Sequence, residues 1–317
     1  MVTRPVDEAM AEDRPAKAAV RQRWVDCLIE LDARWEGREP LYLTLPGAEG
    51  RDVALAVQHG VIALNEAGSI AEESLHKVVA VERGQEAALQ LRRRFPGLKI
   101  LDQPIQSLVR GEGLTSYPEA EHRVWCRALV VNLDLSARLE GEARAGGISF
   151  PVVSWIGKLA VLHAQEPIVP WTLLLTMNAE PSLAHEGLRD IGTLFRENIS
   201  LSPAFRERLA DLVGPTAVEG LSTEATDPLG GSDDQTLRSV VVAAIPKLIA
   251  GVVPEGWVMR SEWCLRYGGE SGHAGMIAYR FDFTLADGNL APVERYKHTV
   301  DDLLRSVERI EEDGTVL

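Results

Sequence analysis

Short apolar runs alternate with helix-like segments along most of this chain, and that alternation constrains its fold more than any other feature. Five of the runs lack the polar alternation of a half-exposed strand, and they span residues 41–45, 77–81, 98–101, 127–135 and 171–177. Such runs are typical of strands in a parallel sheet that helices cover on both faces. Strands separated by segments of helical periodicity predict successive βαβ units, and therefore an α/β fold.

The end of the chain departs from this alternation. Residues 257–267 and 276–285 are both strand-like, and they enclose the glycine-rich segment 268–275. Two adjacent strand-like runs joined by such a segment predict an antiparallel β-hairpin.

These patterns predict a helical extension over residues 1–37 and a main domain over 38–290. Within the main domain, residues of about 181–233 form a helical and loop insert, and residues 291–317 form a C-terminal helix. Because long connections in compact domains are usually functional or disordered, we expect the insert to recognise the substrate.

Charge and cysteine content narrow the classes of partner. The net charge of −14 argues against indiscriminate binding to nucleic acid, which would need a local basic patch such as Arg92–Arg94 or a partner protein. The plain interpretation of Arg92–Arg94 is the solvated face of a helix. Three isolated cysteines without a CxxC pair support neither a disulfide framework nor a zinc ribbon.

The expected location is the cytoplasm. The polar start, Met1–Lys17, does not have the apolar segment of a signal peptide, and the sequence has no run of about 18 apolar residues that predicts a membrane span. We therefore expect no membrane association.

Polar residues and glycines occur where the strand-like runs end. The turn Pro46–Gly50 follows the first run, Glu82 the second and Asp102 the third, while Asn132 and Asp134 share one face of the fourth. Because ligands in open α/β sheets bind outside the carboxyl ends of the strands, these residues predict a nucleotide-type pocket.

Each of these residues also has a plainer interpretation. Pro46–Gly50 can be an ordinary turn, Glu82 a solvated carboxylate, and Asp102 a helix N-cap. Asn132 and Asp134 can likewise be turn residues. Their joint occurrence at successive strand ends is what favours a pocket.

The order of elements over about residues 38–285 resembles the class I S-adenosylmethionine-dependent methyltransferases. In that family, five parallel strands are followed by an antiparallel hairpin. The resemblance implies a mostly parallel, seven-stranded Rossmann-like sheet with helices on both faces and a C-terminal antiparallel hairpin. It also implies S-adenosylmethionine as the cofactor.

The resemblance implies roles for particular residues. The glycine turn would lie against the methionine part of the cofactor, Glu82 would accept hydrogen bonds from the ribose hydroxyls, and Asp102 with Gln103 would hold the adenine. The implied cofactor-binding residues are Thr44, Pro46, Gly47, Gly50, Glu82 and Asp102. Asn132 and Asp134 correspond to the family's catalytic or substrate-facing position.

The leading hypothesis is therefore a methyltransferase whose acceptor the sequence does not identify. The alternative is a non-catalytic, methyltransferase-like scaffold that binds a partner protein or a nucleotide ligand. Two departures motivate it: Leu45 stands where the family carries an acidic residue, and Asn132-Leu133-Asp134-Leu135 lacks the two prolines and the aromatic of base amino-methylating enzymes. A nicotinamide-dependent oxidoreductase is disfavoured because GxGxxG is absent. The histidine spacing indicates no metal site.

Overall fold

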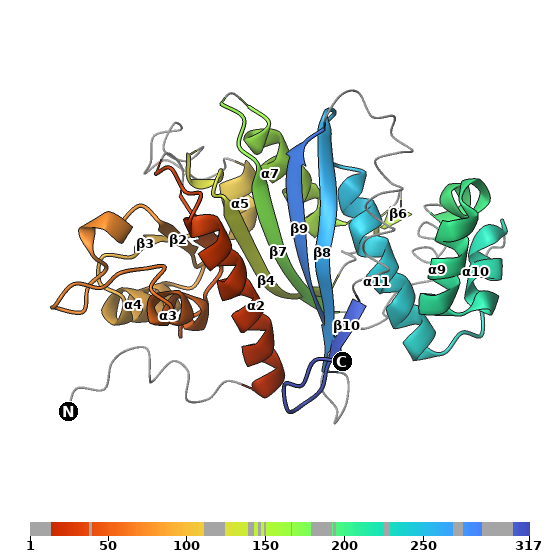
Figure 1. Cartoon of the computed structure of the whole chain (residues 1–317), viewed down its shortest axis with the longest axis horizontal. Helices are drawn as coiled ribbons and strands as arrows, with labels where there is room; N and C mark the ends of the chain where they lie inside the picture. The colour runs from red at the N-terminus through yellow and green to blue at the C-terminus, as the bar shows by residue number, and fades with distance from the viewer. Residues whose placement is uncertain are drawn as a thin grey trace. The chain divides into compact units, whose positions relative to one another are not determined.

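The structure is a computed structural model, and a defined part of the chain is described in it. The described residues are 14–37, 40–110, 124–138, 143–144, 147–148, 150–165, 167–178, 192, 195–224, 229–268, 275–286 and 307–317. The fold is α/β, with one mixed sheet of eight strands in the order β10-β8-β9-β7-β4-β1-β2-β3 (Figure 1). The chain divides into two compact units, with divisions after residues 134, 160, 175 and 309, each of which falls inside a helix or strand.

The first unit spans residues 1–134, 161–175 and 310–317. Its strands are β1 (Tyr42–Thr44), β2 (Val78–Val81), β3 (Lys99–Leu101) and the start of β4 (Val130–Arg138). β1 pairs in parallel with β2 on one side and with β4 on the other, and β2 pairs in parallel with β3. The residues of β1 and β2 are all buried, which agrees with their uninterrupted apolar sequence.

Helices α2 (Pro15–Asp32), α3 (Arg51–Gln58), α4 (Gln85–Arg94) and α5 (Ile105–Arg110) belong to the same unit, and η1 (Glu72–Ser74) is a short 3-10 turn. α2 packs against α3 (Figure 1). Each of the first two parallel strands is followed by its helix, as the βαβ pattern predicts.

The second unit spans residues 135–160 and 176–309. β8 (Trp257–Tyr267) and β9 (Met276–Leu285) form the predicted antiparallel hairpin, with Trp257 opposite Leu285 and an irregularity between Ser261 and Trp263. Other elements that lie wholly or partly in this unit are β5 (Ala143–Arg144), β6 (Gly147–Ile148), α7 (Pro151–His163), β7 (Trp171–Asn178), α9 (Pro203–Val213), α10 (Pro215–Ser222), α11 (Asp234–Ala250) and β10 (Val307–Ile310).

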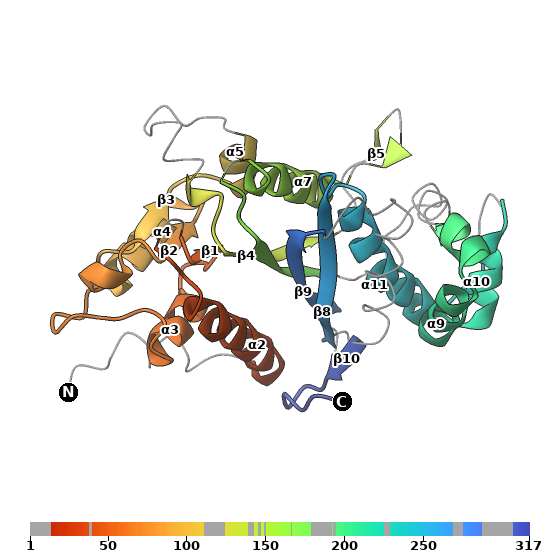
Figure 2. The same ribbon diagram turned by 45° about the horizontal axis from the view of Figure 1, so that its top comes forward.

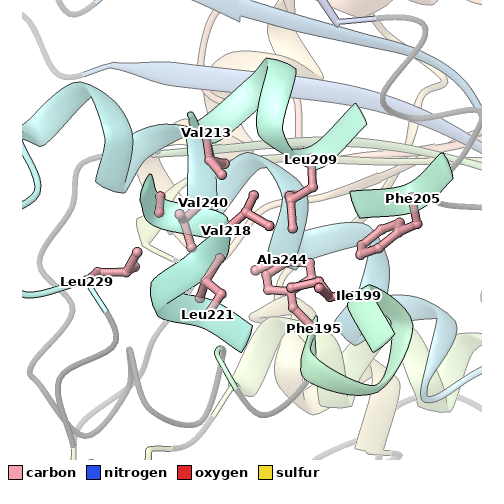
Figure 3. Close-up of a cluster of buried hydrophobic side chains, with 12 residues drawn as sticks. Phe195, Ile199, Phe205, Leu209, Val213, Val218, Leu221, Leu229, Val240 and Ala244 are labelled. Atoms are coloured by element: carbon pink, nitrogen blue, oxygen red, sulfur yellow. The ribbon is translucent and has the colours of Figure 1, made fainter. Parts of the chain in front are cut away.

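The helical part of the second unit has a hydrophobic core of its own. Side chains from α9, α10 and α11, together with the helical residues 195–201, point toward one another (Figure 3). The members of this helical cluster are Phe195, Ile199, Phe205, Leu209, Val213, Ala217, Val218, Leu221, Leu229, Val240, Ala243 and Ala244. Burial of these side chains is the main force that can hold such short helices together in water.

The C-terminal prediction is partly wrong. Within the expected helix 291–317, residues 291–306 lie outside the described part, but Val307–Ile310 form β10, which adds an eighth strand beside β8. The chain then turns at Asp313-Gly314, where Gly314 has a φ of +89°, and Ile310 bridges Val316. An Asp-Gly pair is a strong hairpin signal, and here it outweighs the helical spacing.

The helical part of the predicted insert includes a stretch whose composition is typical of a loop. Pro215–Ser222 form helix α10, although this stretch is rich in small and turn-forming residues. Gly214, with a φ of +88°, ends α9, and Pro215 then takes the first helical position, where its missing N–H costs nothing. Ala217, Val218 and Leu221 form a buried stripe at helical spacing, so periodicity was the better guide here than composition. Residues 181–191 of the insert lie outside the described part.

Candidate functional site

The carboxyl edge of the first unit's strands is the candidate site, because the direction of the sheet's connections reverses there. β1 lies between β2 and β4, so the chain leaves β1 toward one side of the sheet and returns on the other (Figure 2). At such a switch point the loops diverge, and ligands of open α/β sheets bind in the crevice that results. All the site residues predicted from sequence belong to this unit.

A buried hydrogen-bonded chain of side chains joins β4, β1 and α3 at this edge. Asn132 Nδ2 donates to the Tyr42 hydroxyl at 2.7 Å, and that hydroxyl donates to Asp52 Oδ2 at 2.9 Å. The Thr44 hydroxyl donates to the same oxygen, while Val53 N donates to Oδ1 at 2.9 Å. Thr44, predicted to touch the cofactor, is therefore fully buried and used internally.

The strand geometry explains why these side chains meet. Tyr42 and Thr44 are two residues apart, so both point to one face of β1. Thr44 lies opposite Asn132 in the parallel register, and Asp52 comes from the first turn of α3. Sequence reasoning missed Tyr42 and Asp52. The available signal was a carboxylate within an otherwise apolar helix face, which must find donors if it is buried.

Burial dominates the electrostatics of this chain. It raises the pKa of Asp52, and the donors Thr44 and Tyr42, the charge of Arg21 and the amide of Val53 act in the opposite direction. Burial, and then the neighbouring Asp52, raise the pKa of Tyr42 well above its ordinary value. Tyr42 therefore stays a hydroxyl donor at any physiological pH.

Asn132 has one atom that this chain does not use. Its side chain is fully buried, and Oδ1 has no hydrogen-bond partner among the described residues. A buried amide oxygen without a donor costs about 1–3 kcal/mol, so such an atom calls for an explanation.

Asp134 lies two residues further along the same face of β4, and its charge is paired. Lys17 Nζ lies 2.6 Å from Asp134 Oδ1 and 4.6 Å from the centre of the Trp24 ring. The expectation that Asn132 and Asp134 stand at the end of the fourth strand needs correction, because β4 continues to Arg138. Asn132 is level with the end of β1, which stops at Thr44, and Asp134 lies two residues beyond that point.

The glycine turn after β1 has two different glycines. Gly47 has a φ of +63°, and an added Cβ would meet nothing within 4 Å. Gly50 has a φ of +57°, and an added Cβ would meet Phe95 and Leu91 of the α4 region. Close packing against α4 therefore accounts for Gly50, whereas the space beside Gly47 is open. Pro46 is half-buried in the same turn.

Glu82 and Asp102 follow β2 and β3, as predicted. Glu82 Oε1 accepts a hydrogen bond of 2.8 Å from the N–H of Gly84, the N-cap residue of α4. Asp102 Oδ2 lies 2.7 Å from Arg92 Nη2, and both side chains are 43% exposed. The neighbouring Gln103 has a buried Nε2 that finds no acceptor in the described part of the chain.

The described residues contain no group of three or more His, Cys, Asp or Glu side chains that could hold a metal ion. None of the helices among them is long and apolar enough to cross a membrane.

No protein-family model matches the chain, and no curated protein matches it. Among solved structures, it is similar to a Vibrio vulnificus YJ016 protein described as a modification subunit of a type I restriction enzyme. The two chains are 11% identical, with a TM-score of 0.33 over 85% of this chain and 43% of the other. This chain thus spans less than half of that protein. A likeness of this strength establishes neither a family nor an activity.

Proposed function

We propose that the chain binds S-adenosylmethionine along the carboxyl edge of β3, β2, β1 and β4, and that it is a methyltransferase. The methyl acceptor is not part of the proposal. The support comes from the order of the parallel strands, the reversal at β1 and the hydrogen-bonding atoms at this edge.

The observation that carries the proposal is a row of three unused hydrogen-bonding atoms. They are Asn132 Oδ1 on β4, Glu82 Oε2 after β2 and Gln103 Nε2 after β3; within the described part, Glu82 uses only Oε1. Four neighbouring strands at a spacing of about 4.8 Å span roughly 14 Å, which suits an extended nucleoside with an amino-acid tail.

The chemistry of the three atoms fits such a ligand. A ring nitrogen of adenine accepts from an amide donor such as Gln103, and ribose hydroxyls donate to a carboxylate such as Glu82. Gly47, which has open space beside it, lets the backbone of the turn approach the ligand between these ends. When bound, S-adenosylmethionine supplies an electrophilic methyl group. The residues around it bind and orient the reactants, and alignment of this kind needs no acid or base.

Asp134 is the residue that we propose to face the methyl acceptor. It shares a face with Asn132 but lies two residues further from the start of β4, and it is 24% exposed. Its ion pair with Lys17 holds the carboxylate in place without removing its ability to accept a hydrogen bond.

Calorimetric titration with S-adenosylmethionine tests the proposal. We expect wild-type protein to bind with a dissociation constant of about micromolar, and Glu82→Ala to weaken binding by about ten-fold or more. Glu86→Ala, which changes an exposed glutamate in the first turn of α4, is the matched control and should bind normally. If the folded wild-type protein binds no S-adenosylmethionine, the proposal is wrong.

One observation favours the second candidate, a non-catalytic scaffold of the same fold. The carboxylate at the position proposed to face the acceptor, Asp134, is engaged in an ion pair with Lys17. A methyl-transfer assay with labelled S-adenosylmethionine and cell extract separates the candidates. Binding without any labelled product, together with a stoichiometric co-purifying protein, would favour the scaffold.

A further inference from the structure

We infer that Asn132 Oδ1 accepts a hydrogen bond from the α-ammonium group of the cofactor's amino-acid part, and that Tyr42 and Asp52 are positioning residues that keep this oxygen available. The inference rests on the proposed function, since it concerns the same cofactor. It gives Asn132, which the resemblance places at the catalytic or substrate-facing position, a role in binding the cofactor. It also adds two supporting residues that the sequence motifs do not indicate.

The direction of the hydrogen bonds sets the orientation of the Asn132 amide. Asp52 accepts from the hydroxyls of Tyr42 and Thr44 through the same oxygen, so the proton of the Tyr42 hydroxyl points to Asp52. The remaining lone pairs of that hydroxyl can only accept, and they take the Nδ2 proton of Asn132. Oδ1 is therefore turned away from Tyr42 and can only act as an acceptor.

Asp52 is held strongly enough to impose this direction. It lies in the first turn of α3, is 5% exposed, and its other oxygen accepts from Val53 N. A carboxylate with three donors is an acceptor at every bond it makes. The amide of Asn132 could turn over only if the Tyr42 hydroxyl stopped donating to Asp52 and donated to the amide instead.

The chemistry of the amino-acid end decides the partner of Oδ1. An ammonium group provides N–H donors, whereas a carboxylate group offers only acceptors and cannot pair with an acceptor atom. Thr44, the register partner of Asn132, precedes Gly47 by three residues, which places this acceptor beside the glycine turn.

A comparison of two ligands isolates this contact. S-adenosylhomocysteine carries the ammonium group, whereas methylthioadenosine has the same nucleoside but no amino-acid part. The ratio of their dissociation constants, measured by calorimetry on the full chain, reports on the amino-acid end alone. A merely structural role for Asn132 would weaken both ligands together and would leave the ratio unchanged.

The variants are Asn132→Leu, Tyr42→Phe and, as a control, Thr176→Val, which changes a different buried strand residue whose hydroxyl lacks a partner among the described residues. We expect Asn132→Leu to weaken binding of S-adenosylhomocysteine by about ten- to a hundred-fold and binding of methylthioadenosine by less than about two-fold. Tyr42→Phe should lower the preference for S-adenosylhomocysteine by less than Asn132→Leu does, because the amide is then free to turn. Thr176→Val should leave the ratio unchanged.

Each contrary result overturns one part of the inference. If wild-type protein binds both ligands but Asn132→Leu leaves the ratio of their dissociation constants unchanged, the ammonium contact is wrong and the proposed function stands. A normal ratio in Tyr42→Phe overturns the positioning role alone. Wild-type protein that binds neither ligand overturns the proposed function itself.

Discussion

Gly50 lies so close to Phe95 that a methyl group on its Cα would come within 2.7 Å of the ring atom Cε2. The same methyl group would lie 2.8 Å from Leu91 Cδ2. Gly50 is also the N-cap residue of α3 and has left-handed backbone angles. One position thus joins the glycine turn, the start of α3 and the packing of α4.

Gly50→Ala should therefore destabilise the protein more than Gly47→Ala does. Both residues have positive φ, which costs an alanine about 1–2 kcal/mol. Only an alanine at position 50 would also be overpacked against Phe95 and Leu91, so the free energy of unfolding should fall by about 2–4 kcal/mol in Gly50→Ala. Urea unfolding of the two variants measures the difference. Equal free energies of unfolding would show that the packing around Phe95 relaxes at no cost.

The strands could be predicted from sequence because burial leaves a local signature. The run Trp171–Met177 became β7 with one added residue, and the hairpin of β8 and β9 has the predicted ends. Strands that are buried along their length must be apolar along their length, so the pattern of each one is readable without its neighbours.

The side-chain network at the candidate site had no such signature. Tyr42 and Asp52 are joined across a turn, and Asn132 reaches Tyr42 from ninety residues away in the sequence. Asp134 likewise meets Lys17 over 117 residues. Such pairs depend on the parallel register of β1 and β4 and on the packing of α2, which no local pattern of one sequence encodes.

Tyr42→Phe should destabilise the protein, and more so at high pH. The change removes a donor from Asp52 and leaves Asn132 Nδ2 without its acceptor, at a cost of about 1–3 kcal/mol. The folded pKa of Asp52 already lies above 3.8, and losing the Tyr42 donor raises it further. When the pKa of a carboxyl group is higher in the folded than in the unfolded chain, the group stabilises the fold below its unfolded pKa. This contribution is lost as the pH rises through the folded pKa.

Urea unfolding of wild-type protein and Tyr42→Phe at about pH 5 and about pH 8 checks this prediction. The difference between the two proteins should be larger at the higher pH. A difference that shrinks with rising pH would contradict a charged Asp52 as the acceptor of the Tyr42 proton.

Leu209→Ala should destabilise the helical cluster of the second unit. Leu209 is fully buried within that cluster, and removal of its side chain leaves a cavity that costs about 2–5 kcal/mol. Leu201 is 59% exposed on the neighbouring helical stretch, so Leu201→Ala should change stability by about 0.5 kcal/mol or less. Thermal unfolding followed by circular dichroism compares the two. Similar losses from both changes would contradict an independent core in this part.

Lys247 should make the stability of the protein depend on pH above neutrality. Its Nζ donates to Asn198 Oδ1 at 2.8 Å, and burial lowers its pKa from 10.5 to about 8, against the opposing effect of Glu197. The unfolded chain therefore binds a proton before the folded chain does as pH falls. As the pH falls from 10.5 to about 8, the stability of the wild-type protein should therefore decrease, and below about pH 8 it should level off.

Lys247→Met removes this group, so the stability of the variant relative to wild type should rise as pH falls from 10.5 to about 8. The control is Lys158→Met, which changes an exposed lysine on α7 and should follow the wild-type curve. The midpoint of urea unfolding, measured across this pH range, gives the comparison. Parallel curves for Lys247→Met and wild type would show that Lys247 titrates normally in the folded chain.

Gln103, rather than Asp102, should determine affinity for the adenine end of the cofactor under the proposed function. Asp102 is paired with Arg92 at 2.7 Å, whereas Gln103 Nε2 is buried without an acceptor in the described part of the chain. Gln103→Glu keeps the size of the side chain but replaces that donor with an acceptor, so methylthioadenosine should bind about ten-fold more weakly. Asp102→Asn, a matched change one residue away, should alter the dissociation constant by less than about two-fold, because an exposed ion pair contributes little. If Asp102→Asn proves the more harmful change, Asp102 rather than Gln103 binds the adenine base, and the ion pair with Arg92 opens when the ligand binds.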